Sequence, residues 1–240
     1  MTVYDEIIRR TYALLSGHES RSFPYSPENT AKEGSKNQLI LGREAAFELG
    51  AGTLSSVSFV SVTDDESLVP RDEIMVFGKD LGQLKDDCSY ARISLLRTDD
   101  IEQEGEQGAY GIIKNIEMKK YSSSAEGYML RASALSNREQ VRVSKMALKK
   151  GLSFEQVGNL FIKRYKENPH VLAVRQIFVT LPDAPYSELD KLAESAVEIT
   201  RALNHIIADL NMDCHACAWK PVCDEVEGMK ELHKAAVKRG

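Results

Sequence analysis

Three of the four cysteines in this 240-residue chain lie within ten residues, in the segment CHACAWKPVC. Cys214 and Cys217 are separated by two residues, and Cys223 follows after five more. A Cys-x-x-Cys pair can turn two sulfurs toward one point, and it is shared by zinc sites, iron–sulfur sites and dithiol redox centres. Thiols spaced this closely predict a metal site on Cys214, Cys217 and Cys223.

The fourth ligand of such a site is open, because zinc and iron–sulfur sites usually have four ligands. His215 is disfavoured, since it is adjacent to Cys214 and the two side chains cannot easily share one metal. His233 lies ten residues after Cys223 on a predicted C-terminal helix, and we take it as the fourth ligand. Other candidates are Cys88, Asp213, Asp224, an exogenous ligand, or a thiolate from a second copy of the chain, which would make a homo-oligomer.

Two further interpretations of the cysteines remain open. The first is a reduced loop without metal. The second is a redox dithiol made by Cys214 and Cys217, although the strand–Cys-x-x-Cys–helix setting that is usual for this chemistry is missing.

The composition is that of an ordinary water-soluble protein, with 42% hydrophobic residues, 28% charged residues and a formal net charge of -5. This charge argues against a general nucleic-acid binder, because phosphates must be neutralised by excess Lys and Arg. The N-terminal segment carries charges inside its apolar pattern, unlike a secretory signal, and no apolar run approaches the roughly 18 residues of a membrane span. Clustered cysteines do not resemble a disulfide framework. We expect a cytoplasmic protein with reduced thiols and no membrane association.

Periodicity assigns the elements that position these residues. Residues 2–16 have the apolar stripe of an amphipathic helix, with Thr2 and Asp5 at capping-box spacing, and residues 18–36 resemble a surface connection. Short strands are predicted at 37–43, 45–50, 55–62, 72–78 and 90–97. Residues 55–62 alternate small polar and apolar residues, as a half-buried strand does. The acidic run at 98–108 predicts a solvated loop.

The second half of the sequence is predicted to be mainly helical. We expect helices at 112–121, 144–150, 153–167 and 187–210, and strands at 138–143 and 171–181. Ser153 and Gln156 have capping-box spacing. The fold class is therefore α/β (α+β): a mixed sheet of short strands, a helical second half and a C-terminal cysteine metal loop. The expected segments are 1–36, an N-terminal helix and connecting loop; 37–211, an α/β domain; and 212–240, the metal loop and a C-terminal helix.

Several segments resemble acetyl-CoA synthase, the beta subunit of the CO dehydrogenase/acetyl-CoA synthase complex. RVSKMALKKG at 142–151 and FEQVG at 154–158 are similar to a run in that family of the form R-I-S-K-x-A-x-x-x-G followed by I-G. Residues 174–199 resemble its strand and acidic, Ala-rich helix, which leads directly into the cluster-binding cysteines. Residues 43–52, 75–84 and 88–96 resemble upstream segments. The resemblance spans residues 37–223, and the order of elements is more specific than any one motif.

The resemblance implies a cofactor that the present cysteines do not fully supply. The family holds an iron–sulfur cubane and two nickel ions with four cysteines and a later Cys-Gly-Cys. Cys214 and Cys217 match the first pair, and Cys223 matches the third cysteine after a shorter gap. Leu232 and His233 occupy the fourth position, and the sequence has no Cys-Gly-Cys. We therefore expect an iron–sulfur cluster, most simply 4Fe-4S, or zinc, with no complete nickel site.

The resemblance also suggests partners and a role. It implies an accessory or repurposed protein of one-carbon, corrinoid or acetyl-CoA metabolism that binds a corrinoid protein or another subunit of such a complex. If the chain is an enzyme, it would be a CO-methylating transferase related to acetyl-CoA synthase. CoA is a further expected ligand, with Arg142 and Lys145 near its phosphates and Trp219 stacking on it. Solvated helix faces explain the basic residues more simply, and Trp219 is also expected to pack the metal loop.

A helix-turn-helix regulator with a metal-sensing cysteine loop is the alternative function. The stretch from 143 to 165 contains two short helices around Gly151, and basic residues lie late on the second helix. However, the N-terminal end of that helix reads Ser153-Phe154-Glu155-Gln156, where a recognition helix needs polar and basic residues. Gly50 and Gly52 suggest a phosphate loop, but the incomplete motif favours a tight turn.

Overall fold

The computed structural model describes residues 4–35, 38–40, 42–101, 105–133 and 136–208. These residues form a mixed α/β fold with five α-helices and two β-sheets. The helices are α1 (Asp5–Leu15), α2 (Gly105–Ser122), α3 (Lys145–Lys149), α4 (Phe154–Tyr165) and α5 (Tyr186–Ala208). The strands are β1 (Ser20–Pro24), β2 (Ala46–Leu49), β3 (Ser56–Thr63), β4 (Glu73–Phe77), β5 (Tyr90–Thr98), β6 (Tyr128–Ala132), β7 (Glu139–Ser144) and β8 (Val171–Val179). Short 3-10 helices occur at η2 (Pro27–Asn29), η3 (Arg43–Ala45) and η4 (Leu81–Gln83).

The larger sheet has five strands in the order β1-β4-β8-β5-β3. Its pairs are mixed: β3 is parallel to β5 and β4 is parallel to β8, whereas β1–β4 and β5–β8 are antiparallel. Strand β8 lies at the centre, and only Leu172 and Arg175 among its residues are not buried. A central strand covered on both faces has a near-continuous apolar sequence. This explains why VLAVRQIFV is the clearest strand signal in the sequence.

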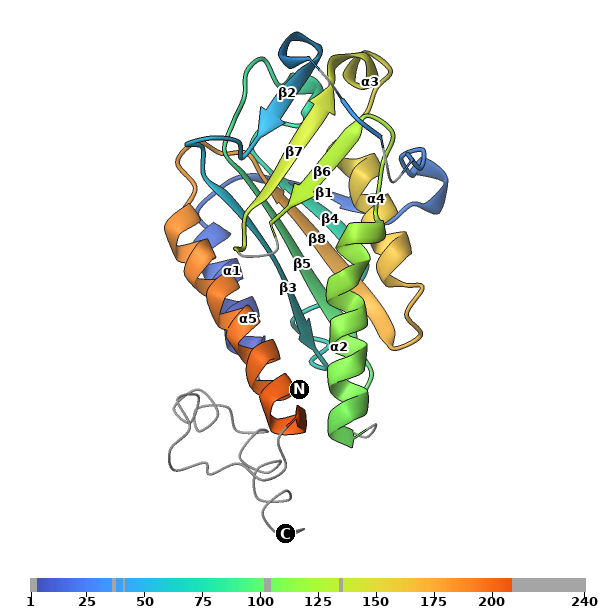
Figure 1. Ribbon diagram of the computed structural model, residues 1–240, viewed down its shortest axis with the longest axis vertical. Coiled ribbons are helices and arrows are strands. Elements are labelled where there is room, and N and C mark those ends of the chain that lie inside the picture. Colours follow the sequence, from blue (N-terminus) through green and yellow to red (C-terminus); the bar gives the residue numbers. More distant parts are fainter. Residues whose placement is uncertain (1–3, 36–37, 41, 102–104, 134–135, 209–240) are drawn as a thin grey trace.

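The smaller sheet is antiparallel, in the order β2-β7-β6, and packs near one end of the larger one (Figure 1). Helices α1 and α5 lie against β3 on one face of the large sheet, and α4 lies against β4 and β8 on the other. Successive side chains of a strand point to opposite faces of the sheet, so they meet either α1 and α5 or α4. Arg175 donates to the Tyr12 hydroxyl of α1, while Ser94 accepts from Tyr165 of α4. The helix α2 contacts both α4 and α5.

A buried ion pair joins the two sheets. The guanidinium of Arg92, on β5, donates to both carboxylate oxygens of Glu139, on β7, at 2.7 and 2.6 Å, and both side chains are completely inaccessible to solvent. Arg92 also donates to the hydroxyls of Ser58 and Ser94, and its guanidinium lies 4.5 Å from the ring centre of Phe161. Desolvating two charges is costly, and it is offset only when the pair is bidentate and its other donors are satisfied. Both conditions are met here.

Hydroxyl groups extend this polar centre on both sides. The hydroxyl of Tyr90, on β5, lies 2.5 Å from that of Tyr128, on β6, in a second buried contact between the sheets. The Ser94 hydroxyl donates to the side-chain oxygen of Gln176 at 2.8 Å, and the Gln176 amide donates to the carbonyl of Ile93. Buried polar groups are stable when they are bonded throughout in this way.

The structure corrects the expectation for residues 55–62. Strand β3 is buried on both faces, with Val60 as its one partly exposed residue, so it is not half-buried. Two of its serines are inside because each has a partner near the ion pair. The Ser56 hydroxyl donates to the backbone carbonyl of Glu139, and the Ser58 hydroxyl donates to the Glu139 carboxylate. The alternating serines therefore suggested a solvent-exposed face, although they are bonded to a polar group in the core.

Three other predictions about local structure were wrong. Residues 18–36 were expected to be a surface connection, but Ser20–Pro24 forms the edge strand β1, paired with β4. The described part of 37–43 is not a strand, and residues 105–108 begin α2 instead of continuing a loop. Strand β6 was not predicted, because its alternation is short and interrupted. Residues before 37 thus belong to the same fold, with α1 against α5 and β1 inside the sheet.

The predicted helices at 2–16, 112–121, 144–150, 153–167 and 187–210 are confirmed where the structure describes them. One of the two hydrogen bonds of the predicted capping box is confirmed: the Ser153 hydroxyl accepts from the N–H of Gln156. The Gln156 side chain donates to Asn29 instead of returning to the cap. No helix within the described ranges combines the length and apolarity needed to cross a bilayer.

We predict that Arg92→Met lowers the free energy of unfolding by about 3–5 kcal/mol, because it leaves the Glu139 carboxylate buried without a partner. The double variant Arg92→Met/Glu139→Leu should recover most of that loss. Denaturant unfolding measures both. Lys32→Ala, which breaks the exposed pair with Glu126, is the control and should leave stability unchanged. A loss in Arg92→Met no larger than in this control would contradict the role of the pair.

Gly158 of α4 provides a second test. A Cβ at this position would lie 2.6 Å from Cγ1 of Ile74. Because glycine has no Cβ, the backbone of α4 can pack directly against Ile74 of β4. Gly158→Ala should lower the free energy of unfolding by about 1–3 kcal/mol, despite the higher helix propensity of alanine. Gly111→Ala, in α2 with open space around it, should instead raise it by about 0.5–1 kcal/mol. Equal effects in thermal unfolding would contradict the close approach of α4 and β4.

Candidate functional site

The predicted metal ligands and one predicted ligand-binding residue lie outside the described residues. These are Cys214, Cys217, Cys223, His233 and Trp219. Helix α5 is described to Ala208, and Cys214 follows six residues later. Within the described ranges, no three His, Cys, Asp or Glu side chains come close enough to hold a metal ion.

Cys88, a candidate fourth ligand, is described and lies in a setting that disfavours metal binding. Its backbone bridges to β2, where its carbonyl accepts from Gly50 and its N–H donates to Glu48. Burial, and next the charge of Asp87, raises the pKa of the Cys88 thiol to about 11. A metal ligand must be a thiolate, which this setting opposes. Burial, and next the nearby Cys88, raises the pKa of Tyr186, which is in the first turn of α5. Cys88 is therefore near the start of α5, whereas the cysteine cluster follows its end at Ala208.

Arg142 and Lys145, the predicted CoA contacts, lie near each other beside β2. The Arg142 guanidinium donates to the Glu48 carboxylate at 2.8 and 2.5 Å and to the carbonyl of Ile40. The Lys145 ammonium lies 4.6 Å from the ring centre of Phe47. Phe47 and Glu48 are adjacent on β2, so their side chains point to opposite faces of the small sheet, and Arg142 is already neutralised by Glu48.

The other basic residues of this region do not form one anion site. Lys163 and Arg164 pair with Glu33, and Lys166 pairs with Asp72. The ion pairs support the simpler account of charged, solvated helix faces.

The packing of α4 argues against the helix-turn-helix alternative. A recognition helix must present its N-terminal residues to a DNA groove. Here Phe154 is buried with its N–H bonded to Asp80, and Glu155 accepts from Asn29. Helix α4 packs between the large sheet and the η2 segment, and most of its residues are buried. The glycine turn remains, but the second helix is a core helix.

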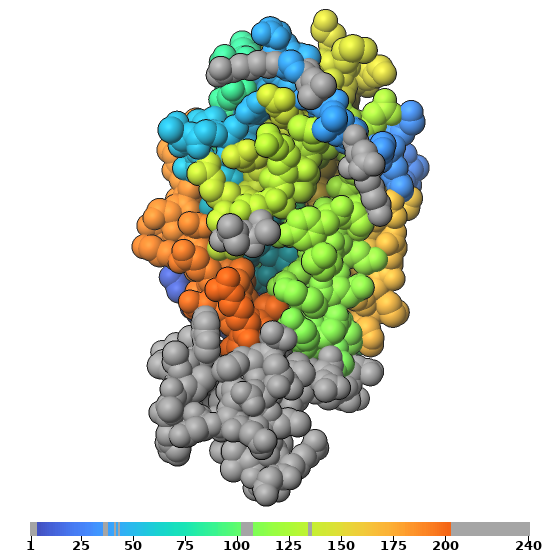
Figure 2. Space-filling view, in the orientation of Figure 1, coloured from blue at the N-terminus to red at the C-terminus, as the bar shows by residue number. Residues whose placement is uncertain are grey.

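A cleft of about 800 Å³ lies between α2 and α5. Figure 2 shows it as a recess between the green α2 and the orange α5, with β3 on its floor. Strand β3 is the edge strand of the large sheet, its Ser58 N–H donates to the carbonyl of Asn137 in the β6–β7 connection, and α2 and α5 contact each other. A cleft of this volume is in the range of small-molecule sites.

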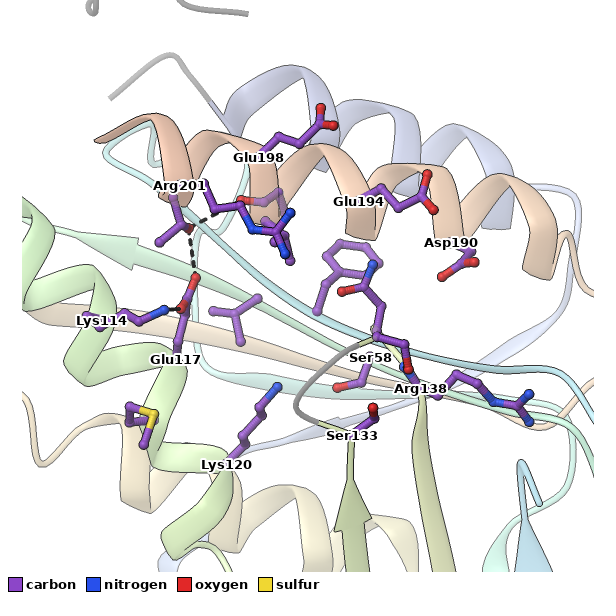
Figure 3. Close-up of a pocket in the computed structure, with 18 of the residues that line it drawn as sticks. Ser58, Lys114, Glu117, Lys120, Ser133, Arg138, Asp190, Glu194, Glu198 and Arg201 are labelled. Carbon is purple, nitrogen blue, oxygen red and sulfur yellow. Dashed lines mark hydrogen bonds and ion pairs between the residues drawn. The ribbon is translucent and has the colours of Figure 1, made fainter. Parts of the chain in front are cut away.

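The two helical walls of the cleft carry different charges (Figure 3). The α5 wall presents Asp190, Glu194 and Glu198, spaced four residues apart along one face of the helix, together with Arg201. The α2 wall presents Lys114 and Lys120 together with Glu117. Arg138 lies at the far end of the floor, where it donates to the carbonyls of Gly50, Gly52 and Leu54 and so fixes the predicted glycine turn.

Two titratable groups in this cleft have shifted pKa values of opposite kind. Burial, and then the nearby charge of Arg92, lowers the pKa of the Lys120 ammonium. Burial, and then the charge of Glu194, raises the pKa of the Asp190 carboxyl. Both shifts favour the neutral form, which is the usual response to an enclosed site. Perturbed groups that share a cleft mark a candidate binding site.

Comparison with known protein families and with curated protein sequences finds no match for this chain.

Sequence reasoning identified the cysteines but missed the cleft. Its lining comes from β3, α2, the β6–β7 connection and α5, which are far apart in the sequence. Lys120 is one of several lysines in an amphipathic segment, and nothing adjacent distinguishes it. The one available signal was the acidic repeat of Asp190, Glu194 and Glu198 along the predicted long helix.

The Cys88 thiol gives a prediction about reactivity. With a pKa of about 11, roughly one Cys88 in a thousand is a thiolate at pH 8. Iodoacetamide labelling followed by peptide mass spectrometry should therefore modify Cys88 far more slowly in the folded protein than in urea. The folded-state rate should rise about tenfold per pH unit between pH 8 and 10. Equal rates in the folded and unfolded protein would contradict the assigned burial.

Proposed function

We propose that this chain is a metal-binding protein related to the beta subunit of the CO dehydrogenase/acetyl-CoA synthase complex. It carries an iron–sulfur cluster or zinc on Cys214, Cys217 and Cys223, with His233 as fourth ligand, and it lacks a complete nickel site. Its role is accessory or repurposed, in one-carbon, corrinoid or acetyl-CoA metabolism in the cytoplasm. The observation that carries the proposal is the cysteine cluster that directly follows the long helix α5.

The proposal is supported by the firm packing of α5, the helix that precedes the cysteines in the sequence. Helix α5 has 23 residues and is anchored by a buried face that includes Leu189, Leu192 and Ala196. Thr200 adds a hydrogen bond to Glu117 of α2 near the far end, and its hydroxyl lies 3.0 Å from that of Tyr4. Six residues span at most about 20 Å, so Cys214 is tethered within that distance of Ala208.

The donor set decides which metals suit the site. Three thiolates and one imidazole match a structural zinc site, and thiolates are also the usual ligands of iron–sulfur clusters. Two-nickel chemistry would need the additional cysteines of the related family. These residues therefore favour electron transfer, a structural role or activation of a thiol over the assembly of an acetyl group.

Partner binding is proposed from the same relationship. The expected partner is a corrinoid protein or another subunit of such a complex. The surface around Lys145 suits a contact of this kind, because Met146 is 68% exposed and the cations Lys149 and Lys150 lie beside it. CoA is the further proposed ligand, and its phosphates would compete with Glu48 for Arg142.

The test is metal analysis of the full chain purified without oxygen. We expect iron with sulfide and broad visible absorption, or zinc without colour, in the wild-type protein. Cys217→Ala should lose most of the metal, because a three-ligand remnant binds weakly. The matched control is Cys88→Ala, which removes a thiol inside the fold and should keep the metal. Metal-free wild-type protein, or equal metal in Cys217→Ala, would overturn the proposal.

A further inference from the structure

Lys120 differs from its neighbours on α2 in how its charge is neutralised. The Lys114 ammonium pairs with Glu117 at 2.9 Å, and the Lys119 ammonium pairs with Glu167 at 2.8 Å. The Lys120 ammonium lies 5.1 Å from the ring centre of Tyr121 and has no carboxylate within ion-pair distance among the described residues. It is partly buried and lines the α2–α5 cleft.

The position of Lys120 makes an unpaired charge costly. Removing a cation from water without an opposite charge is unfavourable, and the shifted pKa of Lys120 reports this cost. Arg92 and Lys114 add like charges nearby, and the two carboxylates that also act on Lys120 are already paired, Glu139 with Arg92 and Glu117 with Lys114. A negatively charged group beside Lys120 would restore the missing partner.

The surroundings of Lys120 suit a small organic anion. Figure 3 shows the Lys120 side chain extending into the cleft, opposite the α5 wall and near Ser133 on the floor. Tyr110 and Tyr121 supply aromatic surface on the same wall. On the opposite wall, Asp190 and Glu194 repel a second negative group but accept hydrogen bonds from hydroxyl or amine groups. The cleft therefore favours a molecule with an anionic end and a hydrogen-bond-donating end.

We propose that the α2–α5 cleft is a binding site for a small organic anion whose carboxylate or phosphate pairs with Lys120, while its hydroxyl or amine groups face Asp190 and Glu194. This site is separate from the proposed cysteine metal site and does not require metal. An anion pairs with the charged form of the Lys120 ammonium, so affinity falls as the pH rises above the pKa of that group.

Isothermal titration calorimetry of the full chain at pH 7 tests the site with three probes: inorganic phosphate, 4-hydroxybutyrate and choline. We expect phosphate, 4-hydroxybutyrate or both to bind. Lys120→Met should weaken that binding about tenfold or more, which is the loss expected for one charge-assisted contact. Lys120→Arg should retain much of it. Lys119→Met is the matched control, since it removes the same charge one residue away and outside the cleft lining, and its affinity should stay within about twofold.

Each outcome decides the proposal. Binding of phosphate alone or of 4-hydroxybutyrate alone identifies the anionic group that the cleft accepts. Binding of choline without either anion, equal affinity in wild type and Lys120→Met, or no anion binding below roughly 10 mM would overturn it. If Lys120→Met does not fold, the wild-type protein with ¹³C-methylated lysines replaces it, and the Lys120 methyl signal must shift on titration more than that of Lys119.

Discussion

The buried pair of Arg92 and Glu139 is the constraint on which the arrangement of the two sheets depends. A charge inside a protein must meet its partner in good geometry, so β5 and β7 can approach in few registers. The pair also accounts for features that are otherwise unexpected. Serines face inward along β3, and Phe161 of α4 lies against the guanidinium. The buried contact of Tyr90 with Tyr128 and the bond from Ser56 to the Glu139 carbonyl join the two sheets beside this pair.

The cleft follows from the way in which helices close the edge of the large sheet. Strand β3 has a partner on one side, and α2 crosses from α4 to α5 beyond its other side. Thr200 and Glu117 join the two helices near one end, so the walls meet there and separate toward Arg138. The same helix α5 forms one wall and leads to the cysteine segment. Helix α5 is thus one wall of the charged cleft and also the element that precedes the cysteine segment in the sequence.

The sequence was informative where the signal was local and failed where it depended on distant residues. Helix α5 and strand β8 were predictable, because a long 3.6-residue repeat is typical of an amphipathic helix and a short continuous apolar run is typical of a buried strand. Strand β1 was missed, since Ser and Pro residues on an edge strand resemble a loop. The partner of Arg92 lies 47 residues away, and neither residue type suggests burial. The cysteines were visible because the ligands of such a site lie within one short segment.

The central claim is that Cys214, Cys217 and Cys223 hold a metal. The most direct test is X-ray diffraction from crystals of the full chain, purified and grown without oxygen, with data collected at the iron and zinc absorption edges. We expect an anomalous peak at one of these edges, within bonding distance of the three sulfurs, and Cys214 within about 20 Å of the end of α5. Ordered cysteines with no anomalous peak between them, or a metal held by other residues, would contradict it.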